Sequence, residues 1–128
     1  MPFLTIRTNV AVDDKTAETI KRGIGRAIEC LPGKSEMSLL VEIRDGARLC
    51  LRGESRTPVA CLDAAVFGNE DHAGRREFTA EATRILCAAL GVAPENVFVN
   101  YADIPAWGVA GMTFVRLARG AGEGGPCR

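Results

Sequence analysis

The second residue of the chain is a proline, and a proline that becomes the amino terminus can act as a base. Methionine before proline is normally removed, which would turn the nitrogen of Pro2 from an amide into a secondary amine. An apolar pocket and a nearby cation both disfavour the ammonium form and lower the pKa of such an amine. A neutral amine can remove a proton from a carbon next to a carbonyl group. The structural alternative is that Pro2 makes a rigid start for an edge strand.

Two polar residues further along the chain could serve the same chemistry, although each has a simpler explanation. Lys34 follows the helix-ending Gly33, at a loop position where a lysine is usually solvated. Asn100 lies in a run of apolar residues, where a buried amide with satisfied hydrogen bonds is the simpler interpretation.

The remaining titratable residues give weaker signals. His72, the single histidine, lies in a polar run and is predicted to be solvated. Arg75 and Arg76 open a predicted helix and are predicted to be surface charges. The cysteines are odd in number and have no CxxC spacing, so neither a zinc site nor a disulfide framework is expected. They are Cys30, Cys50, Cys61, Cys87 and Cys127.

The composition limits the partners of the protein. The 16 basic and 16 acidic side chains balance to a formal net charge of zero, without a long run of either sign. Nucleic acid and anionic membranes are therefore not expected partners. The longest apolar stretches are strand-sized, well short of the roughly 20 residues of a membrane span. Because the first residues lack the features of a classical signal peptide, we expect a cytoplasmic protein.

The hydrophobic pattern predicts one compact domain over residues 1–117 and a flexible glycine-rich tail over residues 118–128. Its first helix is capped by Asp13 or Asp14 and ended by Pro32-Gly33. A second amphipathic helix spans about residues 75–90. Strands are predicted at residues 3–10, 38–44, 48–51, 59–66, 96–102 and 109–115.

An internal repeat and a burial argument predict the fold class. Residues 33–45 and 91–103 have the same length, and both run from a helix-ending glycine through a strand to an aspartate. The predicted strand at 59–66 is apolar on both faces, but the two helices can cover only one face. We therefore expect an α/β (α+β) fold of two β-α-β pseudo-repeats. It forms a four-stranded mixed sheet with two helices on one face and other subunits on the second. The alternative is a monomer with a partly exposed sheet.

The order and spacing of several short motifs resemble those of the macrophage migration inhibitory factor family of the tautomerase superfamily. The likeness covers about residues 1–115, with a small deletion before Trp107. It implies a homotrimer with three active sites at subunit interfaces, in which the second sheet face lines the centre. Each site would be built around a free amino-terminal proline. The motifs are Met1-Pro2-Phe3, Thr8-Asn9-Val10, Gly33-Lys34, Thr57-Pro58-Val59-Ala60-Cys61, Val66-Phe67-Gly68, the run 96–103, and Gly108 through Thr113-Phe114.

The resemblance implies roles for residues near the amino terminus. Pro2 is the general base, and Lys34 lies close to it, where the ammonium group binds the substrate carboxylate and stabilises the enolate. The backbone N–H of Phe67, which stands where relatives usually have isoleucine, is a second carboxylate contact. Phe3 lines the pocket mouth. Cys61 has no CxxC partner, so the thiol–disulfide activity claimed for that motif is not expected.

The rest of the implied pocket comes from the end of the chain. Asn100 reaches into a neighbouring subunit's pocket and contacts the distal end of the substrate. Phe98 stands where many relatives have a tyrosine, which keeps the ring and removes a hydroxyl. Trp107, Val109 and Phe114 would complete an aromatic wall, and their alternative role is core packing.

The expected function is keto–enol tautomerisation of small aromatic 2-oxo acids of the phenylpyruvate type. This isomerase reaction requires neither a metal nor an organic cofactor. One alternative is a cytokine-like or regulatory binding trimer that retains a vestigial proline pocket. Another is a different main reaction of the superfamily, such as decarboxylation or hydration. Arginine-assisted dehalogenation is not expected, because the other polar groups that it needs cannot be placed.

Overall fold

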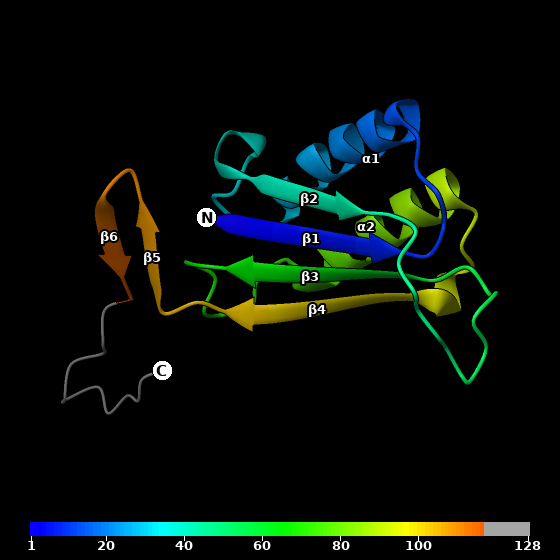
Figure 1. Cartoon of the computed structure of the whole chain (residues 1–128). Helices are drawn as coiled ribbons and strands as arrows, with labels where there is room; N and C mark the ends of the chain where they lie inside the picture. Colours follow the sequence, from blue (N-terminus) through cyan, green and yellow to red (C-terminus); the bar gives the residue numbers. More distant parts are fainter. Residues whose placement is uncertain (117–128) are drawn as a thin grey trace.

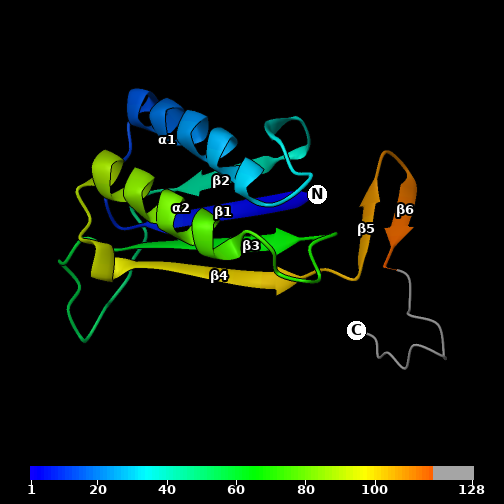
Figure 2. The ribbon, with the colours of Figure 1, turned by 180° about the vertical axis from the view of Figure 1, so that it is seen from behind.

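Four strands form one mixed sheet, and two helices lie across one of its faces (Figures 1 and 2). The computed structural model describes residues 1–116, so the predicted tail at 118–128, with Cys127, lies outside the described residues. The sheet contains β1 (Pro2–Thr8), β2 (Leu40–Arg44), β3 (Ala60–Val66) and β4 (Val97–Asp103), and the helices are α1 (Asp14–Ala27) and α2 (Arg75–Leu90). The smaller elements are the 3-10 helices η1 (Ile28–Cys30), η2 (Glu36–Ser38) and η3 (Pro94–Asn96) and the hairpin strands β5 (Ala106–Val109) and β6 (Met112–Val115).

The sheet consists of two β-α-β units that meet at its centre. β1 and β2 run parallel and are connected through α1, while β3 and β4 run parallel and are connected through α2. β1 and β3 pair antiparallel, which gives the strand order β2-β1-β3-β4. The predicted four-stranded mixed sheet with two helices on one face is confirmed (Figure 2).

Alternation along the central strands explains which face the helices cover. Every second residue is buried, beginning with Pro2 in β1 and Ala60 in β3. These side chains share one core with Ile20 and Ile24 of α1 and Phe78 of α2, all fully buried. Burial of such apolar side chains is the main favourable contribution to folding. None of the helices in the described part of the chain is long and apolar enough to traverse a lipid bilayer.

The second face of the sheet differs from the prediction. Asp63 lies at the centre of β3 on this face, where its carboxylate forms an ion pair with Arg7 of β1. The same carboxylate accepts a hydrogen bond from Nδ2 of Asn100 in β4 at 3.0 Å. The prediction that this strand is apolar on both faces is therefore wrong at Asp63. The carboxylate is accommodated because its neighbours supply a positive charge and a donor.

The strand predicted at residues 48–51 is also wrong. Arg52 and Gly53 have φ angles of 53° and 78°, and they turn the chain back on itself. In this segment the structure has one isolated antiparallel bridge, between Leu51 and Glu54, in place of a strand.

The strand predicted at residues 109–115 is instead part of a hairpin. Ala110 and Gly111 both have positive φ, 54° and 78°, as a two-residue turn with a primed geometry requires. This turn divides the segment and allows β5 and β6 to pair antiparallel.

Gly74 brings the loop before α2 against the end of η1. Its φ is +80°, and a Cβ at this position would lie 1.9 Å from the carbonyl oxygen of Cys30. We expect Gly74→Ala to lower the free energy of unfolding by about 3 kcal/mol or more, because a steric clash adds to left-handed strain. Gly91→Ala is the matched control, because Gly91 has φ +71° and nothing within 4 Å. The control should cost about 1 kcal/mol. Urea unfolding measures both, and equal losses would contradict this account.

Candidate active site

The amino terminus lies against the segment that follows β3. Pro2 is fully buried and pairs with Val66. The amino group of Met1 donates a hydrogen bond to the carbonyl oxygen of Phe67 at 3.0 Å. The carbonyl oxygen of Met1 accepts a hydrogen bond from the N–H of Phe67, also at 3.0 Å. While Met1 is attached, the nitrogen of Pro2 belongs to an amide and is not basic.

Lys34 reaches the same place from the turn after η1. The turn is closed by a hydrogen bond from the Lys34 N–H to the carbonyl oxygen of Leu31 at 3.0 Å. Nζ of Lys34 donates to the carbonyl oxygen of Gly68 at 3.0 Å. A Cβ at Gly68 would lie 3.1 Å from that Nζ, so the absence of a side chain leaves room for the ammonium group. The amino terminus, the turn that carries Lys34 and the Phe67-Gly68 segment are distant in sequence, but they meet at this place.

The surroundings of the amino group favour its neutral form. The pKa of the Met1 amino group is lowered from 8.0 to about 6. Burial is the largest cause, followed by the positive charge of Lys34 and its hydrogen bond to the amine. All three effects disfavour the ammonium form. The Met1 amino group is therefore mostly unprotonated at pH 7 and can accept a proton.

This environment can be tested on the chain that retains Met1. Acylation of the amino terminus by a small reagent, followed by mass spectrometry across a pH series, should give a midpoint near the pKa of about 6. Lys34→Gln should move the midpoint upward, toward but not reaching 8.0, because burial remains. Lys15→Gln, on the exposed surface of α1, is the matched control. A midpoint near 8.0 in the unmodified chain would contradict the inferred environment.

Phe3 and Asn100 lie on the face of the sheet that the helices leave open. Both line a groove of about 280 Å³ there, together with Ala65. Asn100 is exposed, and its Nδ2 is bound to Asp63. Its amide therefore faces this groove and not the buried side of the sheet.

Phe98 lies far from the amino terminus within the same chain. It pairs with Cys61, which in turn pairs with Arg7. Arg7 is five residues along β1 from Pro2, which corresponds to roughly 16 Å of extended strand. A single chain therefore does not bring Phe98 and Pro2 together.

Trp107, Val109 and Phe114 lie on the β5–β6 hairpin. The hairpin stands beyond the end of the sheet where the chain starts (Figures 1 and 2). Trp107 pairs with Phe114, but Phe114 and Val109 are 39% and 44% exposed. The described part of the chain leaves Val109 and Phe114 without a core to pack against, while Trp107 is half-buried.

Sequence reasoning missed a polar cluster beside the site. Arg75 was predicted to be a surface charge, but its side chain is only 12% exposed and forms an ion pair with Asp103. His72 is exposed as predicted, and its Nε2 lies 3.0 Å from the same carboxylate. Partial burial opposes ionisation of Asp103, but hydrogen bonds from Arg75 and His72 outweigh it and hold the pKa of Asp103 below its ordinary value. The only feature of the sequence that pointed to this cluster was the position of Asp103 at the end of the second repeat.

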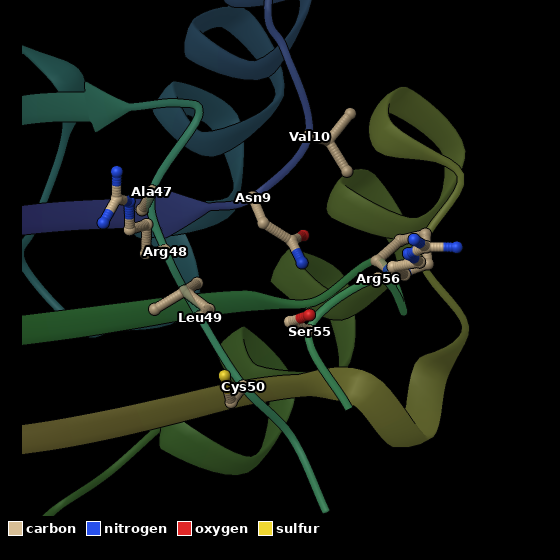
Figure 3. Close-up of a pocket in the computed structure, with 9 residues that line it drawn as sticks. Asn9, Val10, Ala47, Arg48, Leu49, Cys50, Ser55 and Arg56 are labelled. Carbon is tan, nitrogen blue, oxygen red and sulfur yellow. The ribbon is translucent and has the colours of Figure 1, made fainter. Parts of the chain in front are cut away.

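A larger hollow of about 620 Å³ lies at the opposite end of β1 (Figure 3). It contains none of the predicted site residues. Arg48 and Arg56 lie on opposite sides of it and do not converge on one point (Figure 3). The Asn9 side chain donates to the carbonyl oxygen of Thr57 and accepts from the N–H of Val59, both at 2.9 Å, so it has a structural role. Within residues 1–116, no group of three or more His, Cys, Asp or Glu side chains could hold a metal ion.

Several solved structures share this fold. The crystal structure of Leishmania major MIF2 has a TM-score of 0.82 at 21% identity, covering 89% of this chain and 97% of that one. The protein Pt0534, inactivated by 2-oxo-3-pentynoate, has a TM-score of 0.75 at 17% identity, covering 85% and 93%. The wild-type F6 fused 4-OT asymmetric trimer has a TM-score of 0.75 at 17% identity, covering 87% and 94%. At these identities the likeness shows the fold alone.

The family follows from the sequence. The profile of the macrophage migration inhibitory factor (MIF) family matches residues 1–115. The chain therefore belongs to the MIF family. No curated protein matches the chain.

Proposed function

We propose that the protein is a keto–enol tautomerase for small aromatic 2-oxo acids of the phenylpyruvate type, with the free amine of Pro2 as the general base. The observation that carries the proposal is the meeting of a partly buried amino terminus with Lys34. The Met1 amino group beside Lys34 has a pKa of about 6. We expect the same surroundings to keep a free Pro2 amine available as a base near neutral pH. The structural neighbour Pt0534 is inactivated by 2-oxo-3-pentynoate, itself a 2-oxo carboxylate, which supports this class of substrate.

Removal of Met1 would prepare the site in two ways. The nitrogen of Pro2 would become a secondary amine. The N–H of Phe67, which donates to the Met1 carbonyl oxygen, would become free. The Met1 carbonyl oxygen thus stands in for a carboxylate oxygen of the substrate, which the Phe67 N–H and the Lys34 ammonium group would bind together.

The reaction moves one proton. The lone pair of Pro2 takes a proton from the carbon next to the ketone, and the electrons of that C–H bond form the enolate. Lys34 stabilises the negative charge that develops on the enolate oxygen. The proline ammonium then returns the proton to this oxygen, which completes the conversion to the enol. The same steps in reverse convert the enol to the ketone.

The complete pocket would form between subunits of a homotrimer. Phe98 is too far from Pro2 in the same chain, and Asn100 faces the open side of the sheet, so both would be supplied by a neighbouring subunit. The exposed apolar side chains of the hairpin, which include Val109 and Phe114, need cover from a partner. The neighbour F6 fused 4-OT is a trimer, which supports this assembly. The location in the cytoplasm stays a prediction.

The decisive experiment is a spectrophotometric assay of phenylpyruvate tautomerisation. The protein must begin at Pro2, as verified by mass spectrometry, and its oligomeric state is measured in the same buffer. We expect turnover without added metal or cofactor. If a trimeric protein that begins at Pro2 has no activity on any enolisable 2-oxo acid, the tautomerase proposal is wrong and a binding or signalling role takes its place.

A further inference from the structure

We propose that Asn69, Arg75 and Asp103 form a positioning clamp, which holds the loop after β3 so that the main-chain groups of Phe67 and Gly68 stay beside the amino terminus and Lys34. None of the three clamp residues touches the amino group directly. They act through the loop. The inference rests on the proposed function, because it assigns these residues to the positioning of that same site.

Arg75 is the centre of the clamp. Its Nε donates to Oδ1 of Asn69 at 2.8 Å, and its Nη2 donates to the main-chain oxygen of Asn69 at 3.3 Å. The same Nη2 donates to Oδ1 of Asp103 at 2.5 Å. The guanidinium carbon lies 4.8 Å from the centre of the Tyr101 ring. One side chain thus ties the loop to the end of β4, and the planar fork of arginine suits several acceptors at once.

Asn69 is the part of the clamp that belongs to the loop. It is only 5% exposed, which is unusual for a polar loop residue. Its Nδ2 donates to the main-chain oxygen of Ala73 at 3.0 Å, and its main-chain oxygen accepts from the N–H of His72 at 3.1 Å. The two ends of the loop are therefore joined through this one buried amide.

The clamp lies next to the site in sequence and in space. Asn69 directly follows Phe67 and Gly68, whose main-chain groups bind Met1 and Lys34. On the other side, Asp103 pairs with Val66, and Val66 pairs with Pro2. A shift of Asn69 therefore moves the acceptor that holds the Lys34 ammonium group. If the Lys34 ammonium group is held less firmly, its positive charge would lower the pKa of the amine by a smaller amount.

A merely stabilising role makes a different prediction. If the clamp only added stability, its loss would lower the melting temperature but leave the remaining folded enzyme with the same pH profile. A positioning role requires that the acid limb of the profile moves upward in protein that is still folded.

The test compares Arg75→Gln with Arg76→Gln in protein that begins at Pro2. Arg76 is the exposed neighbour on the same turn of α2 and is the matched control. We expect Arg75→Gln to lower kcat/KM for phenylpyruvate by roughly 10- to 100-fold, since small displacements of positioned groups have effects of this size. The midpoint of the acid limb of the kcat/KM profile should move to higher pH by roughly half a unit or more. Arg76→Gln should change neither quantity.

A second variant and a second readout keep the test decisive. Asp103→Asn removes the charge from the other end of the clamp and should also move the acid limb of kcat/KM to higher pH. It provides the test if Arg75→Gln does not fold. His72→Gln shows how much of any pH effect belongs to the histidine on the same carboxylate. The pH dependence of acylation of the Pro2 amine can be measured without turnover. It therefore reports the effect of the clamp on this amine even if the tautomerase proposal fails. Folded Arg75→Gln and Asp103→Asn proteins with unchanged acid limbs and unchanged acylation midpoints would overturn the proposal.

Discussion

Replacing Pro2 with alanine is expected to lower kcat/KM for phenylpyruvate by about 100-fold or more, because general-base catalysis contributes at least this much. The variant keeps an amine at the chain end but loses the ring. Without the ring, the amine is primary, can rotate, and is more easily solvated, so it is less well aligned with the substrate. Steady-state kinetics on protein with a verified amino terminus measures the effect.

The control for this variant is Pro94→Ala, because Pro94 lies in η3 and is exposed, away from the amino terminus. Its kcat/KM should stay within a factor of about two, as expected for a surface change of small free-energy effect. Melting temperatures of both variants separate a loss of catalysis from a loss of fold, since Pro2 is also buried in the core. Undiminished turnover by folded Pro2→Ala would rule out the proline mechanism.

Replacing Lys34 with alanine is expected to have an effect of similar size. Removal of one group that stabilises a developing negative charge typically lowers kcat by about 100- to 1,000-fold. KM should rise as well, because the substrate carboxylate loses its ammonium partner. The acid limb of the kcat/KM profile should move to higher pH, since the positive charge of Lys34 lowers the pKa of an amine at this place.

Two further variants sharpen the second prediction. Lys34→Arg keeps the positive charge and should recover part of the carboxylate binding, so its KM should lie between those of the unmodified protein and Lys34→Ala. Lys15→Ala, on the exposed face of α1, should behave as the unmodified protein. Lys34→Ala with both kinetic constants and the acid limb unchanged would remove Lys34 from the mechanism.

The fold was predictable where local signals agree with tertiary packing. Helix α2 begins and ends as predicted because glycines in the left-handed conformation, Gly74 and Gly91, flank it. Asp13 caps α1 as one of the two predicted alternatives, with its side chain bound to the N–H of Thr16 at 2.8 Å. The two errors in strand boundaries fall at Arg52 and Ala110, which adopt positive φ without being glycine. Arginine and alanine rarely adopt positive φ, so the only turn signal at each reversal was the glycine that follows, Gly53 or Gly111.

The candidate site was predictable in part. The resemblance connected Pro2 with Lys34, and the chain does bring the amino terminus and Lys34 together. The Asn69–Arg75–Asp103 cluster had no comparable signal, because ion pairs between distant segments leave no periodic pattern in the sequence. The roles assigned to Phe98, Asn100 and the hairpin stay predictions, because they depend on contacts between subunits that one chain does not contain.

The measurement that tests the central claim most directly compares two forms of the same chain, one that retains Met1 and one that begins at Pro2. The two proteins have identical side chains beyond Met1, and they differ in whether the Pro2 nitrogen is an amide or an amine. The account predicts that kcat/KM for phenylpyruvate is at least about 100-fold higher for the form that begins at Pro2. Equal rates for the two folded forms would contradict it.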